Sequence, residues 1–353
     1  MHKYRLAVIP GDGIGVDVIE EGLRVLRRAA EVTDSFAIET TIHPWSCEWY
    51  LEHGRMMPED GLDRLSDSDA IYLGAVGFPG VPDHVSLWGL LLPIRFGFDQ
   101  YVNLRPIQLL DGIEGPLRGR TSADIDMLCI RENTEGEYAG PGGRFHEGHP
   151  DEFALQTSVF TRRGVERIAR YAFDRARERR KRLASATKSN ALKHSAVLWD
   201  EVVAAVAVDY PDVSLTKFHV DALAARFVTA PDTLDVVVAS NLFGDILTDL
   251  GGALQGSLGL PAGANLNPER RYPSMFEPIH GSAPDIAGQG IANPMAAVWS
   301  ASLMLEHLGE AEAASLVMAA LRRVAAAGPK TRDVGGRSTT TEVGAAIAAA
   351  VGA

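Results

Sequence analysis

Cysteine is scarce in this sequence: its 353 residues include only Cys47 and Cys129, far apart and outside any CxxC spacing. The sequence therefore excludes a disulfide scaffold and favours folding in a reducing compartment. Long apolar runs are also lacking, so no stretch reaches the length of a membrane span. The first residues, MHKYRLAVIPGDG, lack the apolar core and cleavage site of a signal peptide. We therefore expect a cytoplasmic protein.

Positive charge is in deficit. Lys and Arg number 34 against 46 Asp and Glu, which gives a net charge of −12, and the pI is about 5.3. This balance argues against binding to nucleic acid or to an anionic membrane. The hydrophobic fraction of 46% and the charged fraction of 23% are ordinary for a globular enzyme. The length suits two domains or one two-lobed unit.

Short apolar runs alternate with amphipathic segments along the whole chain. This alternation predicts an α/β fold with a large, mostly parallel sheet. In contrast, the glycine- and proline-rich stretch 273–290 is expected to be a loop. The expected strands are Tyr4–Pro10, Phe36–His43, Asp69–Gly74, Tyr101–Leu109, Met127–Ile130, Ala154–Phe160, Leu183–Thr187, Ser214–Val220 and Val236–Ala239.

The glycine-rich stretch Gly11-Asp12-Gly13-Ile14-Gly15 lies between the first strand and the first helix. A turn of this kind can hold a pyrophosphate, as in dinucleotide-binding folds. Its spacing differs from G-x-G-x-x-G, however. We therefore favour a tight turn, at the rim of an active site, over a Rossmann phosphate site.

The stretch Leu234–Gly252 organises the expected chemistry. After the buried strand Val236–Ala239, a helix begins near Leu242, and Asp245 and Asp249 stand four residues apart on one of its faces. No lysine or arginine lies within a helical turn of this pair. Such a pair is an anchor for Mg²⁺ or Mn²⁺. The alternative is a solvated helix start, where acidic residues favour the N-terminal dipole.

Three arginines lie at expected strand or helix ends: Arg95, Arg105 and Arg131. The guanidinium fork suits carboxylates, because it donates two parallel hydrogen bonds. Together the three arginines predict a site for a small polyanion, although each taken singly is better explained as a surface ion-pair partner.

Other candidate groups follow the same logic. Lys188 and Asp221 are expected at strand ends, where open α/β sheets place their chemistry. Lys188 suits a general base or a capping charge. Tyr138 lies in a polar, glycine-flanked turn and suits a proton donor or an interface aromatic.

Six motifs then occur in order: PGDGIG, NLRP, RENTEGEY, TKSN, SNLFGDILTDL and EPIHGSAPDIAGQGIANP. With them the chain resembles the β-decarboxylating dehydrogenases, the isocitrate and isopropylmalate dehydrogenase family. The segments DHVSLWG, FTRRG and GANLNPER look most similar to the tartrate and D-malate dehydrogenase branch.

The resemblance implies roles for the matching residues. Arg95, Arg105 and Arg131 would bind the substrate carboxylates. Lys188 would be the base and Tyr138 the acid. Asp245 and Asp249 would bind Mg²⁺ or Mn²⁺ together with Asp221, and both Asp221 and Lys188 would come from the partner subunit of a homodimer. The cofactor NAD would lie against the 281–293 loop; the expected contacts are His280, Gly281, Ser282, Ala283, Asp285 and Asn293.

The resemblance also implies an isopropylmalate dehydrogenase-like two-lobed fold, not a conventional Rossmann domain. We expect 1–103 plus 253–353 to form a large lobe with the adenosine-binding loop. We expect 104–252 to form a small lobe with the metal ligands and catalytic residues. A hairpin within 140–160 would be part of the dimer arm.

Substrate choice is expected to depend on the residues before Arg95. Where isopropylmalate dehydrogenases commonly carry an acidic residue, this chain has Trp88, and Leu90, Leu91 and Leu92 follow. A third carboxylate facing leucines would lose its hydration without gaining a partner. We therefore expect an enzyme that acts on D-malate or tartrate, and the alternative is a 3-isopropylmalate dehydrogenase.

Two non-catalytic alternatives are also considered. A regulatory subunit of the family would be expected to lack Lys188, Tyr138 or an aspartate. A cation-binding module without catalysis is the remaining alternative.

Overall fold

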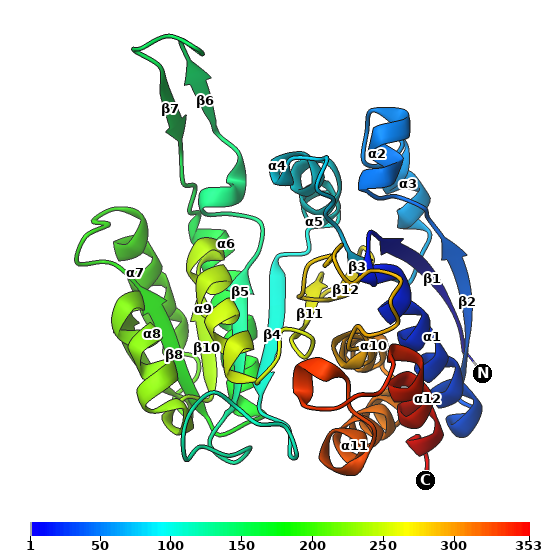
Figure 1. The fold of residues 1–353 in the computed structure, drawn as a ribbon. Coiled ribbons are helices and arrows are strands. Elements are labelled where there is room, and N and C mark those ends of the chain that lie inside the picture. Colours follow the sequence, from blue (N-terminus) through cyan, green and yellow to red (C-terminus); the bar gives the residue numbers. More distant parts are fainter. Residues whose placement is uncertain (1) are drawn as a thin grey trace. The chain divides into compact units, whose positions relative to one another are not determined.

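The computed structural model describes residues 2–353, which form two compact units. Within the described residues, the first unit comprises 2–100, 105–125 and 252–353, and the second comprises 101–104 and 126–251. Among residues 2–353, no helix combines the length and the hydropathy that crossing a membrane requires. Helices and strands alternate along the chain, as expected for an α/β fold with a large, mostly parallel sheet (Figure 1).

In the first unit the strand order is β2-β1-β3-β12-β11. β1 pairs in parallel with β2 and β3, β3 pairs in parallel with β12, and β11 and β12 form an antiparallel pair. The carboxyl ends of β1, β3 and β12 therefore lie at one edge of the sheet. The strands are β1 His2–Gly11, β2 Phe36–Ile42, β3 Ala70–Ala75, β11 Ala262–Leu266 and β12 Ser274–Pro278.

Helices α1 and α10 pack against this sheet, and α11 and α12 pack against them in turn. The helices of the first unit are α1 Ile14–Thr33, α2 Cys47–His53, α3 Gly61–Ser66, α4 Asp83–Ser86, α5 Leu92–Gly97, α10 Met295–Leu308, α11 Ala311–Ala327 and α12 Thr340–Ala350. Between α4 and α5, the residues Leu87–Leu91 form a turn of π-helix, so one helix runs from Asp83 to Gly97 with a wider turn in its middle.

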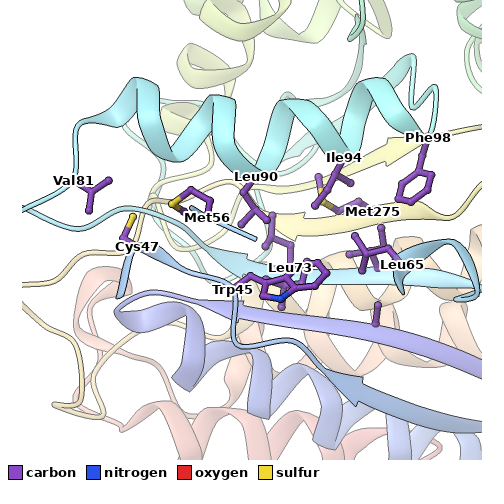
Figure 2. Packing of buried hydrophobic residues seen from close by; sticks show 13 residues of the cluster. Trp45, Cys47, Met56, Leu65, Leu73, Val81, Leu90, Ile94, Phe98 and Met275 are labelled. Atoms are coloured by element: carbon purple, nitrogen blue, oxygen red, sulfur yellow. The ribbon is translucent and has the colours of Figure 1, made fainter. Parts of the chain in front are cut away.

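A core cluster lies beneath this helix (Figure 2). Leu90, Ile94 and Phe98 point from the helix toward the sheet, where Leu73 and Met275 lie. Leu90 and Ile94 have no exposed surface. Burial of side chains of this size stabilises the fold by roughly 1.5–3 kcal/mol each, so the cluster fixes the helix against the sheet.

In the second unit the strand order is β5-β10-β8-β9, and all three pairings are parallel. Helix α6 packs against β5, β10 and β8, and α7 packs against α6. The elements are β5 Asp126–Glu132, α6 Arg162–Arg177, β8 Arg182–Thr187, α7 Ser195–Ala207, β9 Ser214–His219, α8 Val220–Thr229, β10 Val236–Ala239 and α9 Asn241–Leu254. Short 3-10 turns occupy Glu137–Ala139, Pro231–Thr233 and, in the first unit, Arg332–Val334.

A separate antiparallel pair, β6 Gly142–Phe145 with β7 Phe153–Gln156, extends away from the rest of the second unit (Figure 1). Phe145 and Phe153 stack on it with ring centroids 4.9 Å apart, and both are about half exposed. This is the hairpin expected within 140–160.

Two expectations need correction. The boundary expected near residue 104 is wrong for 105–125, because this segment belongs to the first unit. Strand β4 (Val102–Gln108) passes from the second unit into the first, where Gln255 donates to the carbonyl of Gln108.

The prediction of a loop over 273–290 is also partly wrong. Its residues Ser274–Pro278 form the buried strand β12, because Phe276 and its neighbours pair with β3.

Candidate active site

In the first unit, a cavity of about 310 Å³ lies at the carboxyl ends of β3 and β12. This edge of a parallel sheet is where α/β proteins bind ligands. The walls carry both apolar and charged side chains. The lining residues include Leu73–Val76, Asp83, Ser86, Leu87, Leu91, Arg95, Arg105 and Glu277–Gly281.

Two of the three expected substrate arginines, Arg95 and Arg105, line this cavity, and both are buried. Arg95 donates from Nη2 to Oε1 of Glu277 at 3.1 Å, and both side chains are less than 8% exposed. Asn265 donates to the same Glu277 oxygen at 2.7 Å. A buried charge pair with a further hydrogen bond fixes the guanidinium in place.

The π-helical turn decides which residues before Arg95 reach the cavity. Leu87 and Leu91 line it together with Arg95. Leu90 and Leu92 lie in the core, so the expectation that all three leucines face the substrate is wrong for these two. Trp88 is 46% exposed and near Phe96, and it does not line the cavity.

Of the expected cofactor residues, His280 and Gly281 line the cavity. Nε2 of His280 is buried without a hydrogen-bond partner among residues 2–353, and burial lowers the pKa of its imidazole. Asp285 is exposed. Oδ1 of Asn293 accepts from the amide of Met295, the first residue of α10, and Nδ2 of Asn293 donates to Asp333. Ser282 is buried, and Ala283 has a left-handed φ of 41°.

In the second unit, Arg131, Tyr138 and Asp245 converge. Arg131 at the end of β5 forms an ion pair with Oδ1 of Asp245 on α9, and the Tyr138 hydroxyl donates to Oδ2 of Asp245 at 2.9 Å. Burial and the Asp245 carboxylate raise the pKa of Tyr138, which keeps the hydroxyl protonated. The expectation that no cation relieves Asp245 holds only along the helix, because Arg131 arrives from another strand.

Arg131 is held from two sides. Oδ1 of Asn241 accepts hydrogen bonds from its Nε at 3.0 Å and its Nη2 at 2.7 Å. Gly244 lets α9 approach, since a Cβ there would lie 2.6 Å from Cγ of Arg131. The first residues of α9 thus place the buried guanidinium beside Asp245.

Lys188 and Asp221 form a second pair in this unit. Nζ of Lys188, just after β8, donates to Oδ1 of Asp221 at 2.6 Å, and Asp221 lies in the first turn of α8. This hydrogen bond to Lys188 lowers the pKa of Asp221. Among residues 2–353, no three acidic, histidine or cysteine side chains are placed to hold a metal ion. The exposed Asp249 stands one turn beyond Asp245 on α9.

Sequence reasoning missed four groups that line the cavity or support it: Glu277, Asp83, Ser86 and Leu87. Glu277 opens the EPIHGSAPDI motif, and a charged residue inside an apolar strand was the signal that could have marked it. Sequence reasoning also assigned no site role to Asn241, although this side chain binds Arg131.

Comparison with known proteins shows the family to which the chain belongs. Residues 5–347 match the isocitrate/isopropylmalate dehydrogenase family, and the chain belongs to this family. It is 54% identical over 352 residues to a probable tartrate dehydrogenase/decarboxylase of Agrobacterium vitis, covering 99% of this chain and 98% of the relative. It is 55% identical over 355 residues to the decarboxylating D-malate dehydrogenase of Escherichia coli K12, covering 98% of each.

A solved structure shows the same fold. The isocitrate dehydrogenase of Methylococcus capsulatus superposes with a TM-score of 0.88 at 34% identity, covering 99% of both chains.

Proposed function

We propose that this protein oxidises and decarboxylates a small 2-hydroxydicarboxylate, with NAD and a divalent cation as cofactors. D-malate would give pyruvate and CO₂ with reduction of NAD⁺. Tartrate would give oxaloglycolate with reduction of NAD⁺ or, where the oxidised product loses CO₂ and is then reduced by the same NADH, D-glycerate and CO₂. Near-full-length similarity to relatives named for these two activities supports the proposal. The observation that carries it is the convergence of Arg131 and Tyr138 on Asp245.

Arg95, Arg105 and Arg131 would bind the two substrate carboxylates. Guanidinium groups held by neighbouring side chains need little reorganisation to bind an anion. Arg95 is held by Glu277, and Arg131 is held by Asn241. The substrate would therefore meet donors that already have a fixed direction.

Asp245 and Asp249 fit a hard divalent cation, since they offer carboxylate oxygens one helical turn apart on one side of α9. The Asp245 side chain is 35% exposed and therefore accessible. Asp221 of a partner subunit would complete the ligand set, which agrees with the lack of a third ligand within residues 2–353. When bound, Mg²⁺ or Mn²⁺ would acidify the substrate hydroxyl and stabilise the developing enolate oxygen.

Proton transfers fall to two side chains. Lys188 of the partner subunit would take the proton of the substrate hydroxyl while hydride leaves C2 for the nicotinamide. The keto acid then loses CO₂ as its C–C bond breaks. Tyr138 would protonate the carbon from which CO₂ has left. The hydrogen bond from its hydroxyl to Asp245 supports this role, because it holds the hydroxyl beside the proposed metal ligand.

The adenosine side of NAD would lie along the loop after β12. The unpaired Nε2 of His280 gives this loop a buried polar atom without a protein partner. The exposed Asp285 would accept hydrogen bonds from ribose hydroxyls and repel a 2′-phosphate, which favours NAD over NADP.

The cavity also supports a substrate without a third carboxylate. Leu87 and Leu91 lie on the same helix face as Arg95, and within residues 2–353 the acidic side chains that line the cavity are those of Asp83 and Glu277. A third substrate carboxylate would face apolar or like-charged groups, a loss of several kcal/mol.

An assay of NADH formation with a panel of 2-hydroxydiacids tests the proposal. We expect D-malate and tartrate to give higher kcat/KM than isocitrate and 3-isopropylmalate. A higher value for either of the latter two would contradict the substrate assignment. No NADH with any substrate and metal would instead support a regulatory subunit or a cation-binding module.

A mixing experiment tests the shared site. Lys188→Ala and Tyr138→Phe chains, each inactive alone, would form heterodimers with one intact site. Random exchange would then restore about a quarter of wild-type activity. No recovery after verified exchange would show that each site is built from one chain.

A further inference from the structure

The turn Gly11–Gly15, which follows β1, has no part in the proposed chemistry. It nevertheless contacts two loops that form walls of the cavity in the first unit. One is the Ala75–Gly77 loop after β3, and the other is the His280–Ser282 loop after β12. Because β1, β3 and β12 run parallel, this turn and both loops lie at the same edge of the sheet.

Asp12 binds the first loop. Its side chain is 3% exposed, and no lysine, arginine or histidine among residues 2–353 lies within ion-pair distance of it. Oδ2 accepts from the amide of Gly77 at 3.0 Å, and both oxygens accept from the amide of Cys47 at 3.0 Å. The amide of Asp12 donates to the carbonyl of Ala75 at 2.7 Å. The loop is thus held on both sides of Val76, which lines the cavity.

Chemistry explains why this residue is an aspartate. A third amide, that of Glu48, lies 3.4 Å from Oδ1, and the Cys47 thiol also donates to the carboxylate, so only hydrogen-bond donors converge on it. A carboxylate offers about four acceptor positions and no donor. An asparagine would turn an NH₂ group toward some of these amides and leave buried donors unpaired. Cys47 lies at one end of the core cluster (Figure 2), so α2 provides a rigid support for the carboxylate.

Gly13 and Ile14 contact the second loop. The amide of Ile14 donates to the carbonyl of Ser282 at 2.8 Å. At Gly13, where φ is 55°, a Cβ would lie 2.1 Å from that same carbonyl oxygen. The contact therefore requires glycine, both for its backbone conformation and for the close approach.

We propose that Asp12 and Gly13 are positioning residues, which set the distance between the two cavity walls and thereby control the affinity for the nicotinamide cofactor. This inference rests on the proposed function, since it assumes that the cofactor lies between these walls. Asp12 acts on the Ala75–Gly77 wall and Gly13 on the Ser282 wall. Arg95 is held by Glu277 and Asn265, independently of the turn.

The test compares Asp12→Asn and Gly13→Ala with a matched control, Asp235→Asn. Asp235 is also a buried aspartate, 1% exposed, but it lies in the second unit, where it accepts hydrogen bonds from Arg179 and Arg180. Three quantities are measured for each variant: the Kd for NADH by fluorescence titration, the KM values for NAD⁺ and D-malate, and the urea midpoint of unfolding.

We expect Asp12→Asn and Gly13→Ala each to raise the Kd for NADH and the KM for NAD⁺ about tenfold or more, since misplacing a binding group by about 1 Å can cost up to about 100-fold. The KM for D-malate should change much less. Asp235→Asn should lower the urea midpoint and leave the Kd for NADH unchanged.

Unchanged NADH affinity in both turn variants would overturn the inference, and so would an equal loss of affinity in Asp235→Asn. If Asp12→Asn fails to fold, Gly13→Ala alone decides, on the same Kd. A wild-type protein that neither binds NADH nor reduces NAD⁺ would refute the proposed function itself, and this inference with it.

Discussion

The candidate site residues of the two units are held in different ways. In the first unit, Arg95 and Glu277 form a buried pair, both less than 8% exposed, in a cavity that this unit builds by itself. In the second unit the acidic partners are open to solvent: Asp245 is 35% exposed and Asp221 is 67% exposed. Solvent-screened contacts exchange partners at low cost, whereas breaking a buried pair leaves an uncompensated charge.

This difference suggests a division of labour. The buried pair provides a rigid framework, and its loss should affect stability as well as activity. The acidic side chains of the second unit can release their oxygens to a cation or a substrate, and Asn241 still holds the buried Arg131 when Asp245 is lost. Loss of these acidic side chains should therefore affect activity more than stability. Four substitutions test this contrast.

The largest effect is expected from Asp245→Asn in the second unit. Removing the charge of this proposed metal ligand should lower kcat by about 10³-fold, which corresponds to several kcal/mol of stabilisation of the transition state. The concentration of Mn²⁺ needed for half activity should rise. The urea midpoint should fall less than in Arg95→Gln, because Asn241 still accepts two hydrogen bonds from the buried Arg131. Asp200→Asn, which removes a surface contact with Lys217, serves as the control. Full activity of the wild type in excess chelator would contradict the metal assignment.

A smaller loss of activity is expected from Tyr138→Phe. This variant removes the hydroxyl that we propose as the proton donor, so kcat for pyruvate formation should fall about 10²-fold. Tyr210→Phe is a matched control, because the Tyr210 hydroxyl also donates to a carboxylate, that of Asp174 at 3.0 Å. If the two variants lost equal activity, Tyr138 would have no special chemical role.

In the first unit, Arg95→Gln should lower the free energy of unfolding by about 3 kcal/mol, because it leaves the buried Glu277 without its cation. The double variant Arg95→Gln/Glu277→Gln should recover part of this stability but none of the activity. Urea unfolding and the D-malate assay measure the two effects separately. Equal stability of Arg95→Gln and wild type would remove the contrast between the units.

The smallest effect concerns pH. Burial, with a contribution from Arg270, lowers the pKa of His307 in the first unit to about 4. The unfolded chain therefore binds a proton there between pH 6.5 and 4 that the folded state does not bind, so stability falls as pH falls through this window. His307→Gln should reduce the loss of unfolding free energy between pH 7 and pH 4.5 by about 2 kcal/mol. The exposed His149, changed to Gln, should have no such effect.

Much of the architecture could be predicted from local patterns. The strand Val236–Ala239 agrees with the structure at both ends, and Asp245 and Asp249 lie on the helix expected after it. Such agreement is expected, because apolar runs and helical periodicity are properties of neighbouring residues. The short helices α2 and α3, in contrast, escaped prediction, since six or seven residues give little periodic signal.

The sequence by itself determined which side chains this protein offers to its chemistry, and their order along the chain was enough to identify the family. Only the tertiary structure decided how they are paired. Arg131 stands 114 positions from Asp245, and Arg95 stands 182 positions from Glu277. Because of the π-helical turn, the side chain of Leu90 lies in the core and that of Leu91 lines the cavity. Such contacts depend on strand order and helix register, which no local pattern encodes.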